Sequence, residues 1–226
     1  YLVLIIFHAV TGLFLWVFPD TGFNIAESGY AGLDGLFYLA PWVFMFLVPA
    51  VTMRSFAEEK KLGTLEVLFT RPPSDMQIIV AKYMAGVCLV LFALAFTFVY
   101  YFSVSYLSVP AGNVDTGGIW GSYAGLFFLC AGFVAIGIFA SSLTDNQVVA
   151  FVTAVFLCFF CYIGFDFIGG LGLPGSVSVW VQMAGISAHY VAMSRGVIDS
   201  RDVIYFASIA ALFLAATRLV TASRRW

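Results

Sequence analysis

Six apolar stretches have lengths that suit a helix crossing a lipid bilayer, and they limit the possible fold more than any other feature. They are residues 2–18, 36–53, 78–109, 121–143, 148–168 and 203–220. A bilayer core requires about 20 apolar residues in helical form. Only 10% of the residues are charged, whereas soluble domains carry about 25%, so charged side chains cannot cover a water-facing surface. We therefore expect an all-α polytopic membrane protein with six transmembrane helices, folded as one domain over residues 1–226.

Basic residues are distributed unevenly between the two sides of these stretches. If the N-terminus is cytoplasmic, eight of the ten lie on the cytoplasmic side, and only Arg195 and Arg201 lie on the other. Cytoplasmic loops of membrane proteins carry the excess of Lys and Arg. We therefore expect both termini in the cytoplasm. The loops 19–35 and 110–120 and the segment 169–202 then face outward.

Residues 55–77, between the second and third apolar stretches, form the longest strongly charged part of the sequence. They hold seven of the 22 charged side chains, which comprise 10 basic and 12 acidic residues. Within them, Leu65, Leu68 and Phe69 share one face of a predicted short helix, which ends before Pro72. The charged residues beside this apolar ridge are Glu58, Glu59, Glu66 and Arg71. The pattern fits a surface for a soluble partner, and it equally fits an ordinary interfacial loop.

Helix start and stop signals flank this charged part. We expect the second apolar helix to continue to Lys61 or Leu62, because Gly63 suits the position after a helix C-terminus. On the other side, Ser74 and Gln77 have the spacing of a capping box, which would start the third transmembrane helix. The charged loop 54–77 is therefore predicted to be held between two defined helix ends.

The fourth and fifth apolar stretches are predicted to form a tight helical hairpin. Thr144 and Gln147 have capping-box spacing and would start the fifth helix. In the fourth, Gly121 and Gly125 are four residues apart, and small residues at this spacing let helices approach closely in lipid. This pattern favours close packing, within the chain or between two subunits.

Residues 169–202 form an unusual connection between the fifth and sixth stretches. They begin with the helix-breaking sequence GGLGLPG, and the apolar run 177–186 that follows is too short to span a bilayer. A run of this length is typical of a re-entrant or interfacial segment. We expect its polar side chains to form an ordering network, not a catalytic site. These side chains are His189, Arg195, Arg201 and Asp202.

Several functional classes are disfavoured by what the sequence lacks. It contains none of the motifs GxSxG, HExxH or GxxxxGK[ST]. The predicted spans are nearly free of charged residues, whereas ion-coupled transporters keep carboxylates or bases there. Cys158 and Cys161 have CxxC spacing, but a structural metal site usually needs four ligands. We expect no catalytic residue, metal or cofactor in this chain, and no nucleic acid as a partner.

Two longer phrases resemble one transporter family. Residues 54–75, RSFAEEKKLGTLEVLFTRPPSD, are similar to the cytoplasmic loop of ABC-2 type transporter permeases. Residues 186–206, ISAHYVAMSRGVIDSRDVIYF, are similar to the outer segment of the same family. The order of the six spans agrees as well. Within the family, the sequence most resembles the permease subunit associated with bacterial gliding motility.

This resemblance implies a fold, a location and partners. The fold would be the six-helix ABC-2 transmembrane domain, of type V exporter-like form, in the bacterial inner membrane. Residues 65–70 would be the core of a coupling helix that docks on a separate ATPase subunit, and that subunit would bind ATP and Mg²⁺. The segment 169–202 would supply re-entrant helices over the translocation path. A second permease subunit, identical or related, would complete the path within the lipid bilayer.

The sequence is therefore interpreted as the membrane-spanning subunit of an ATP-driven exporter, without enzymatic activity of its own, in a system related to gliding motility. The apolar, aromatic interior favours an amphipathic, lipidic or peptide-like substrate. Two alternatives remain open. One is a non-transporting membrane scaffold that uses the same ATPase-binding loop, and the other is a channel or secondary transporter.

Overall fold

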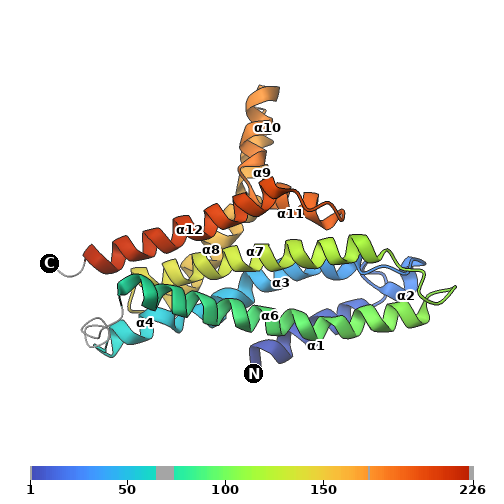
Figure 1. The fold of residues 1–226 in the computed structure, drawn as a ribbon, viewed down its shortest axis with the longest axis horizontal. Coiled ribbons are helices and arrows are strands. Elements are labelled where there is room, and N and C mark those ends of the chain that lie inside the picture. Colours follow the sequence, from blue (N-terminus) through green and yellow to red (C-terminus); the bar gives the residue numbers. More distant parts are fainter. Residues whose placement is uncertain (1, 65–73, 173, 224–226) are drawn as a thin grey trace.

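The computed structural model describes residues 2–64, 74–172 and 174–223, and this part of the chain is helical without any strand (Figure 1). Its elements, in order, are α1 (Leu2–Trp16), α2 (Ile25–Ser28), α3 (Asp34–Thr52), α4 (Arg54–Lys61), α6 (Asp75–Leu107), α7 (Thr116–Leu143), α8 (Gln147–Phe159), the π-helical turn η1 (Phe160–Gly164), α9 (Phe165–Gly169), α10 (Gly175–Met183), α11 (Ile186–Ser194) and α12 (Ser200–Ala222).

Five helical stretches are long and apolar enough to cross a membrane. They are Asp34–Lys61, Asp75–Leu107, Thr116–Leu143, Gln147–Gly169 and Ser200–Ala222. A further helix, α1, is apolar but has 15 residues, which corresponds to about 22 Å of helix. The described chain is thus a polytopic α-helical membrane protein, as the composition predicts.

Helix α7 is the central element of the bundle. It packs against α3, α6, α8, α11 and α12, and most of these helices run along the long axis of the molecule beside it (Figure 1). In the most apolar 18-residue stretch of α7, 72% of the sequence is buried inside the bundle, whereas the corresponding value for α12 is 17%. The apolar surface that α6, α8 and α12 leave uncovered is suited to lipid or to another membrane subunit, because a span that is apolar all round needs no polar solvent.

Local sequence signals explain most helix ends. The capping box at Ser74 and Gln77 is confirmed, with both reciprocal hydrogen bonds present at the start of α6. The predicted box at Thr144 is wrong, because the side chain of Asn146 caps α8 by accepting from the N–H groups of Val148 and Val149. Thr144 has extended backbone at the end of α7, so α8 begins two residues later than the motif suggests.

The segment 169–202 contains two short helices that differ in their packing. Helix α10 has no buried residue and projects away from the bundle (Figure 1). Helix α11 buries Ile186, Tyr190 and Met193 and lies against α7. The apolar run predicted over 177–186 therefore lies mainly in α10, outside the packed core.

Candidate functional site

Helix α4 carries the chain from α3 toward the charged loop. It begins at Arg54, one residue after the end of α3, and its last residue is Lys61, as predicted. Gly63 follows with a φ of +67°. The N–H of Gly63 donates to Lys60 O at 3.2 Å, and that of Thr64 donates to Glu59 O at 3.0 Å. These two bonds form a Schellman motif, which fixes the point where the chain leaves α4.

The residues predicted to dock a partner lie just beyond this point. Leu65, Glu66, Leu68, Phe69 and Arg71 are outside the described residues. The two remaining members of that set, Glu58 and Glu59, are half-buried on α4. The described structure therefore defines the base from which the predicted docking segment starts.

A buried serine on α7 holds the first turn of α4. The Ser141 hydroxyl accepts from the N–H groups of Phe56 at 2.9 Å and Ala57 at 3.1 Å. It donates to the Met53 carbonyl at 2.8 Å. In a regular helix the N–H of Ala57 would bond to the carbonyl of Met53, so the hydroxyl bridges groups of the α4 ladder. We call these contacts of Ser141 the α4–α7 joint.

Close packing and a lysine reinforce the α4–α7 joint. Ser141 has no exposed surface, so water does not compete for its three hydrogen bonds. One helical turn earlier, Gly137 leaves no room for a Cβ against Thr52 of α3. The ammonium group of Lys60 donates to the backbone carbonyl of Ser142. The contacts of Ser141 and Lys60 thus fix α4 to α7, and the Gly137 contact places the end of α3 against the same part of α7.

Helix α6 also contacts α4, through an ion pair. Lys82 Nζ lies 2.5 Å from Glu59 Oε1 and 2.5 Å from the Ser55 carbonyl oxygen. The same ammonium group lies 4.8 Å from the centroid of the Phe56 ring, a cation–π distance. The two side chains of the pair are 21% and 30% exposed, so solvent and salt weaken this contact.

The predicted network in 169–202 is partly assembled. His189 Nδ1 lies 2.6 Å from Asp202 Oδ1, and Nε2 lies 2.9 Å from the Met183 carbonyl oxygen. The imidazole ring stacks on Tyr205 with the centroids 3.8 Å apart. Both neighbouring atoms, a carboxylate oxygen and a carbonyl oxygen, are hydrogen-bond acceptors. His189 therefore ties the end of α10 to the start of α12.

The two arginines predicted for this network lie apart from it. Arg195 lines a cavity of about 310 Å³ with Asp34 and Asp115, and it forms no ion pair within the described part of the chain. Arg201 contributes its backbone N–H, which donates to the Asp199 carboxylate at 3.0 Å. This bond lowers the pKa of Asp199 below its ordinary value, as expected for a carboxylate that caps a helix.

Helix α11 is held to α7 by close approach of the two backbones. A Cβ on Gly121 would lie 2.5 Å from the Gly196 Cα, and a Cβ on Gly125 would lie 3.0 Å from the Met193 Cβ. The Ser122 hydroxyl donates to the Ser194 carbonyl at 2.9 Å. The small-residue pair predicted in this helix thus packs within the chain, against α11 and the residues that follow it.

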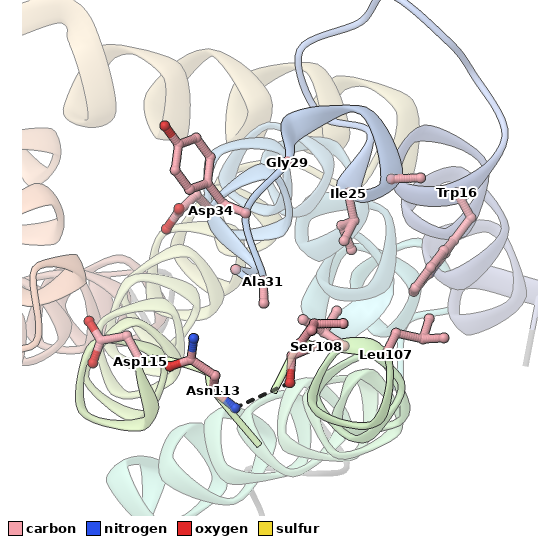
Figure 2. Close-up of a pocket in the computed structure, with 14 residues that line it drawn as sticks. Trp16, Ile25, Gly29, Ala31, Asp34, Leu107, Ser108, Asn113 and Asp115 are labelled. Atoms are coloured by element: carbon pink, nitrogen blue, oxygen red, sulfur yellow. Dashed lines mark hydrogen bonds between the residues drawn. The ribbon is translucent and has the colours of Figure 1, made fainter. Parts of the chain in front are cut away.

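A cavity of about 770 Å³ opens at the end of the bundle that is remote from α4. Figure 2 shows Asp34 and Asp115 on one side of it, and Trp16 and Leu107 on the other. Both carboxylates stand at helix starts: Asp34 lies in the first turn of α3, and Asp115 caps α7 by accepting from Gly118 N–H at 3.0 Å. They favour the positive end of each helix dipole, which accounts for them without a ligand.

Several polar contacts described here escaped the sequence reasoning. The contacts of Ser141, Lys82 and Asp166 join residues that are at least 21 positions apart in the sequence, so no local motif indicates them. Asp166 accepts from the Ser187 hydroxyl at 2.7 Å, just after the π-helical turn η1. The signal available was the presence of a polar residue inside an apolar stretch, which indicates a specific partner. Among the described residues, no group of three or more His, Cys, Asp and Glu side chains could hold a metal.

These features define a class of protein: a polytopic helical membrane protein with a charged helix, α4, that is fixed to the bundle. A family model described as ABC-2 family transporter protein matches residues 23–179. The match covers more than half of the chain, which therefore belongs to the ABC-2 transporter family and is a membrane-spanning permease component of an ABC transporter. Membership implies an ATPase partner. No curated protein matches the sequence.

The matched range includes the whole of α3, α4, α6, α7 and α8 and most of α10. It therefore contains the charged loop 54–77 and the α4–α7 joint. It ends before α11 and α12, so the match does not include residues 186–206, the second sequence segment that resembles the family.

Proposed function

We propose that this chain couples ATP hydrolysis by a separate ATPase subunit to export across the bacterial inner membrane, with the loop 54–77 as the docking site. Support comes from one observation. Helix α4 is charged but is fixed on two sides, to α7 through Ser141 and to α6 through Lys82. A loop that begins on such a base can transfer a displacement to the bundle, whereas a freely hinged loop would absorb it.

The docking contact itself is proposed for Leu65, Leu68 and Phe69, with Glu58, Glu59, Glu66 and Arg71 around them. Three apolar side chains on one face of a short helix, next to water, are typical of an interaction surface. Buried apolar anchors dominate binding energy, and charges at the rim mainly affect the association rate and orientation. ATP and Mg²⁺ bind in the partner subunit under this proposal.

A second permease subunit completes the assembly. The uncovered apolar surfaces of α8 and α12 can serve as its contact, and ATP-driven closure of the ATPase pair then moves two packed halves as rigid bodies. Both termini are cytoplasmic in this arrangement. The resemblance to gliding-motility permeases supports a role for the complex in that process. A lipidic or peptide-like substrate suits a path with few charges.

The docking proposal is tested by a pull-down of the ATPase with full-length permease variants in detergent. Leu68→Ala or Phe69→Ala is expected to weaken binding by about 1–4 kcal/mol, roughly five- to several-hundred-fold in Kd. Leu91→Ala, an exposed apolar residue on α6, is the matched control and should bind as wild type. If a folded variant with alanine at Leu65, Leu68 and Phe69 retains the ATPase at wild-type affinity, the loop is only a solvated connector.

A further inference from the structure

Helix α7 makes specific polar contacts near both of its ends with the two parts of the molecule that flank the bundle core. At one end the Ser141 hydroxyl bonds to Met53, Phe56 and Ala57 of the α4 region. Toward the other end the Ser122 hydroxyl bonds to Ser194 at the end of α11. The helix has 28 residues and so is about 42 Å long. Through these contacts, the single helix α7 connects α4, from which the predicted docking segment starts, to the 169–202 segment.

The surroundings of α7 prevent it from absorbing a displacement locally. It is the most deeply buried of the membrane-length helices, and packed interiors transmit strain because they are dense. It contains no proline and no charged residue. Its glycines at positions 121 and 137 stand against Gly196 and Thr52, without space for a Cβ. A shift of α4 is therefore passed to α7 at Ser141, and from α7 to α11 at Gly121 and Ser122.

The second attachment of α4 cannot replace this route. Lys82 and Glu59 lie partly in solvent, and ion pairs of this kind are weak and sensitive to salt. Lys82 also belongs to α6, which has fewer buried residues than α7 despite its greater length. The hydrogen bonds of Ser141 are neutral, buried, directional and shielded from water. They therefore make α7 follow a displacement of α4 more closely than the ion pair makes α6 follow it.

We propose that α7 transmits the displacement of the docking loop to the 169–202 segment, and that Ser141 is the positioning residue through which this displacement enters α7. This inference rests on the proposed function, because it assumes that an ATPase acts on the loop. Ser141 touches neither the ATPase nor the substrate, and it acts by holding the first turn of α4. Coupling between two sites must be demonstrated energetically, which the following experiment does.

The reporter is a cysteine at Val197, an exposed residue between α11 and α12, in a full-length chain whose four native cysteines are replaced. The permease–ATPase complex is placed in lipid nanodiscs. The labelling rate with a membrane-impermeant maleimide is measured without nucleotide and with ATP plus vanadate. We expect ATP to change this rate about fivefold or more, the lower end of typical couplings between sites.

Ser141→Ala should retain the ATPase in a pull-down but lose most of the ATP-dependent change at Val197→Cys. Thr217→Val is the matched control, because Thr217 is also a buried hydroxyl, but it bonds only within α12, to Phe213 O at 2.7 Å. The control should respond to ATP as wild type. Ser122→Ala, at the other end of α7, should also reduce the ATP-dependent change in labelling rate. If Ser141→Ala does not fold, the result with Ser122→Ala tests transmission through α7.

The outcomes separate this inference from the proposed function. If the variants at Leu65, Leu68 and Phe69 abolish ATPase binding while Ser141→Ala and Ser122→Ala respond to ATP as wild type does, docking stands and transmission through α7 is overturned. The inference is equally overturned if the bound ATPase with ATP changes nothing at Val197→Cys. Retained ATPase binding in the triple-alanine variant overturns the docking proposal instead.

Discussion

The two ends of α7 hold their neighbours by different means. At the Ser141 end, a charged helix is attached through a buried hydroxyl that bonds to its backbone. At the Gly121 end, an uncharged helix is attached mainly by backbone contact, since Gly121 and Gly196 leave no room for a Cβ. In lipid the hydrophobic effect does not drive helices together, so close packing and interhelical hydrogen bonds take its place.

The difference between the two attachments follows from what each neighbour must do. Helix α4 carries charges at positions 54 and 58–61, so apolar packing alone cannot hold all of it. Helix α11 is apolar at its contact face and can approach a glycine surface closely. The α4 attachment is therefore made by hydrogen bonds, and the α11 attachment by close packing with the Ser122 hydrogen bond beside it.

The glycine contact offers the most severe test of this comparison. Gly121→Ala should destabilise the fold by about 3 kcal/mol, because the new Cβ meets backbone that cannot move aside, and overpacking of a core costs about this much. Gly132→Ala is the matched control on the same helix, where the nearest atom to a new Cβ is Ile209 Cγ2 at 3.8 Å. Unfolding by SDS in mixed micelles measures both. Equal effects would show that α11 is not held by close approach.

The contact between His189 and Asp202 should have an intermediate effect. The Asp202 residue is 6% exposed, and its replacement by alanine leaves His189 Nδ1 without its partner. We expect a loss of about 1–2 kcal/mol, within the range for an unsatisfied buried polar group. Asp199→Ala, at the exposed cap of the same helix, should have a clearly smaller effect. If the two substitutions have equal effects in the SDS titration, His189 does not fix α11 to α12.

The ion pair between α4 and α6 should contribute least. Lys82→Met is expected to reduce stability by about 1 kcal/mol or less, as for partly exposed ion pairs. The difference from wild type should narrow as salt is raised from about 0.01 to 1 M, because screening shortens the Debye length. Lys61→Met, at the exposed end of α4, is the control. A salt-independent effect of Lys82→Met as large as that of Gly121→Ala would contradict the ranking of the two attachments.

Much of the fold could be predicted from the sequence, because the relevant signals are local. The apolar stretches identify the helices of membrane length, and Gly63 and the Ser74–Gln77 box identify two helix ends. Hydropathy and capping depend on residues within a few positions of one another. The same locality explains the error at Thr144: Thr144 and Asn146, two positions apart, both have side chains that can cap a helix, and the structure shows that Asn146 accepts from the first N–H groups of α8.

The sequence by itself determined that this is a helical membrane protein with a charged loop set between two defined helix ends. Only the tertiary structure decided how that loop is attached. Ser141 and Phe56 are 85 positions apart, and Lys82 and Glu59 are 23 apart. Their meeting depends on the relative rotation and depth of packed helices, which no local pattern encodes. A serine within an apolar stretch indicates that it has a partner, but packing alone determines which partner that is.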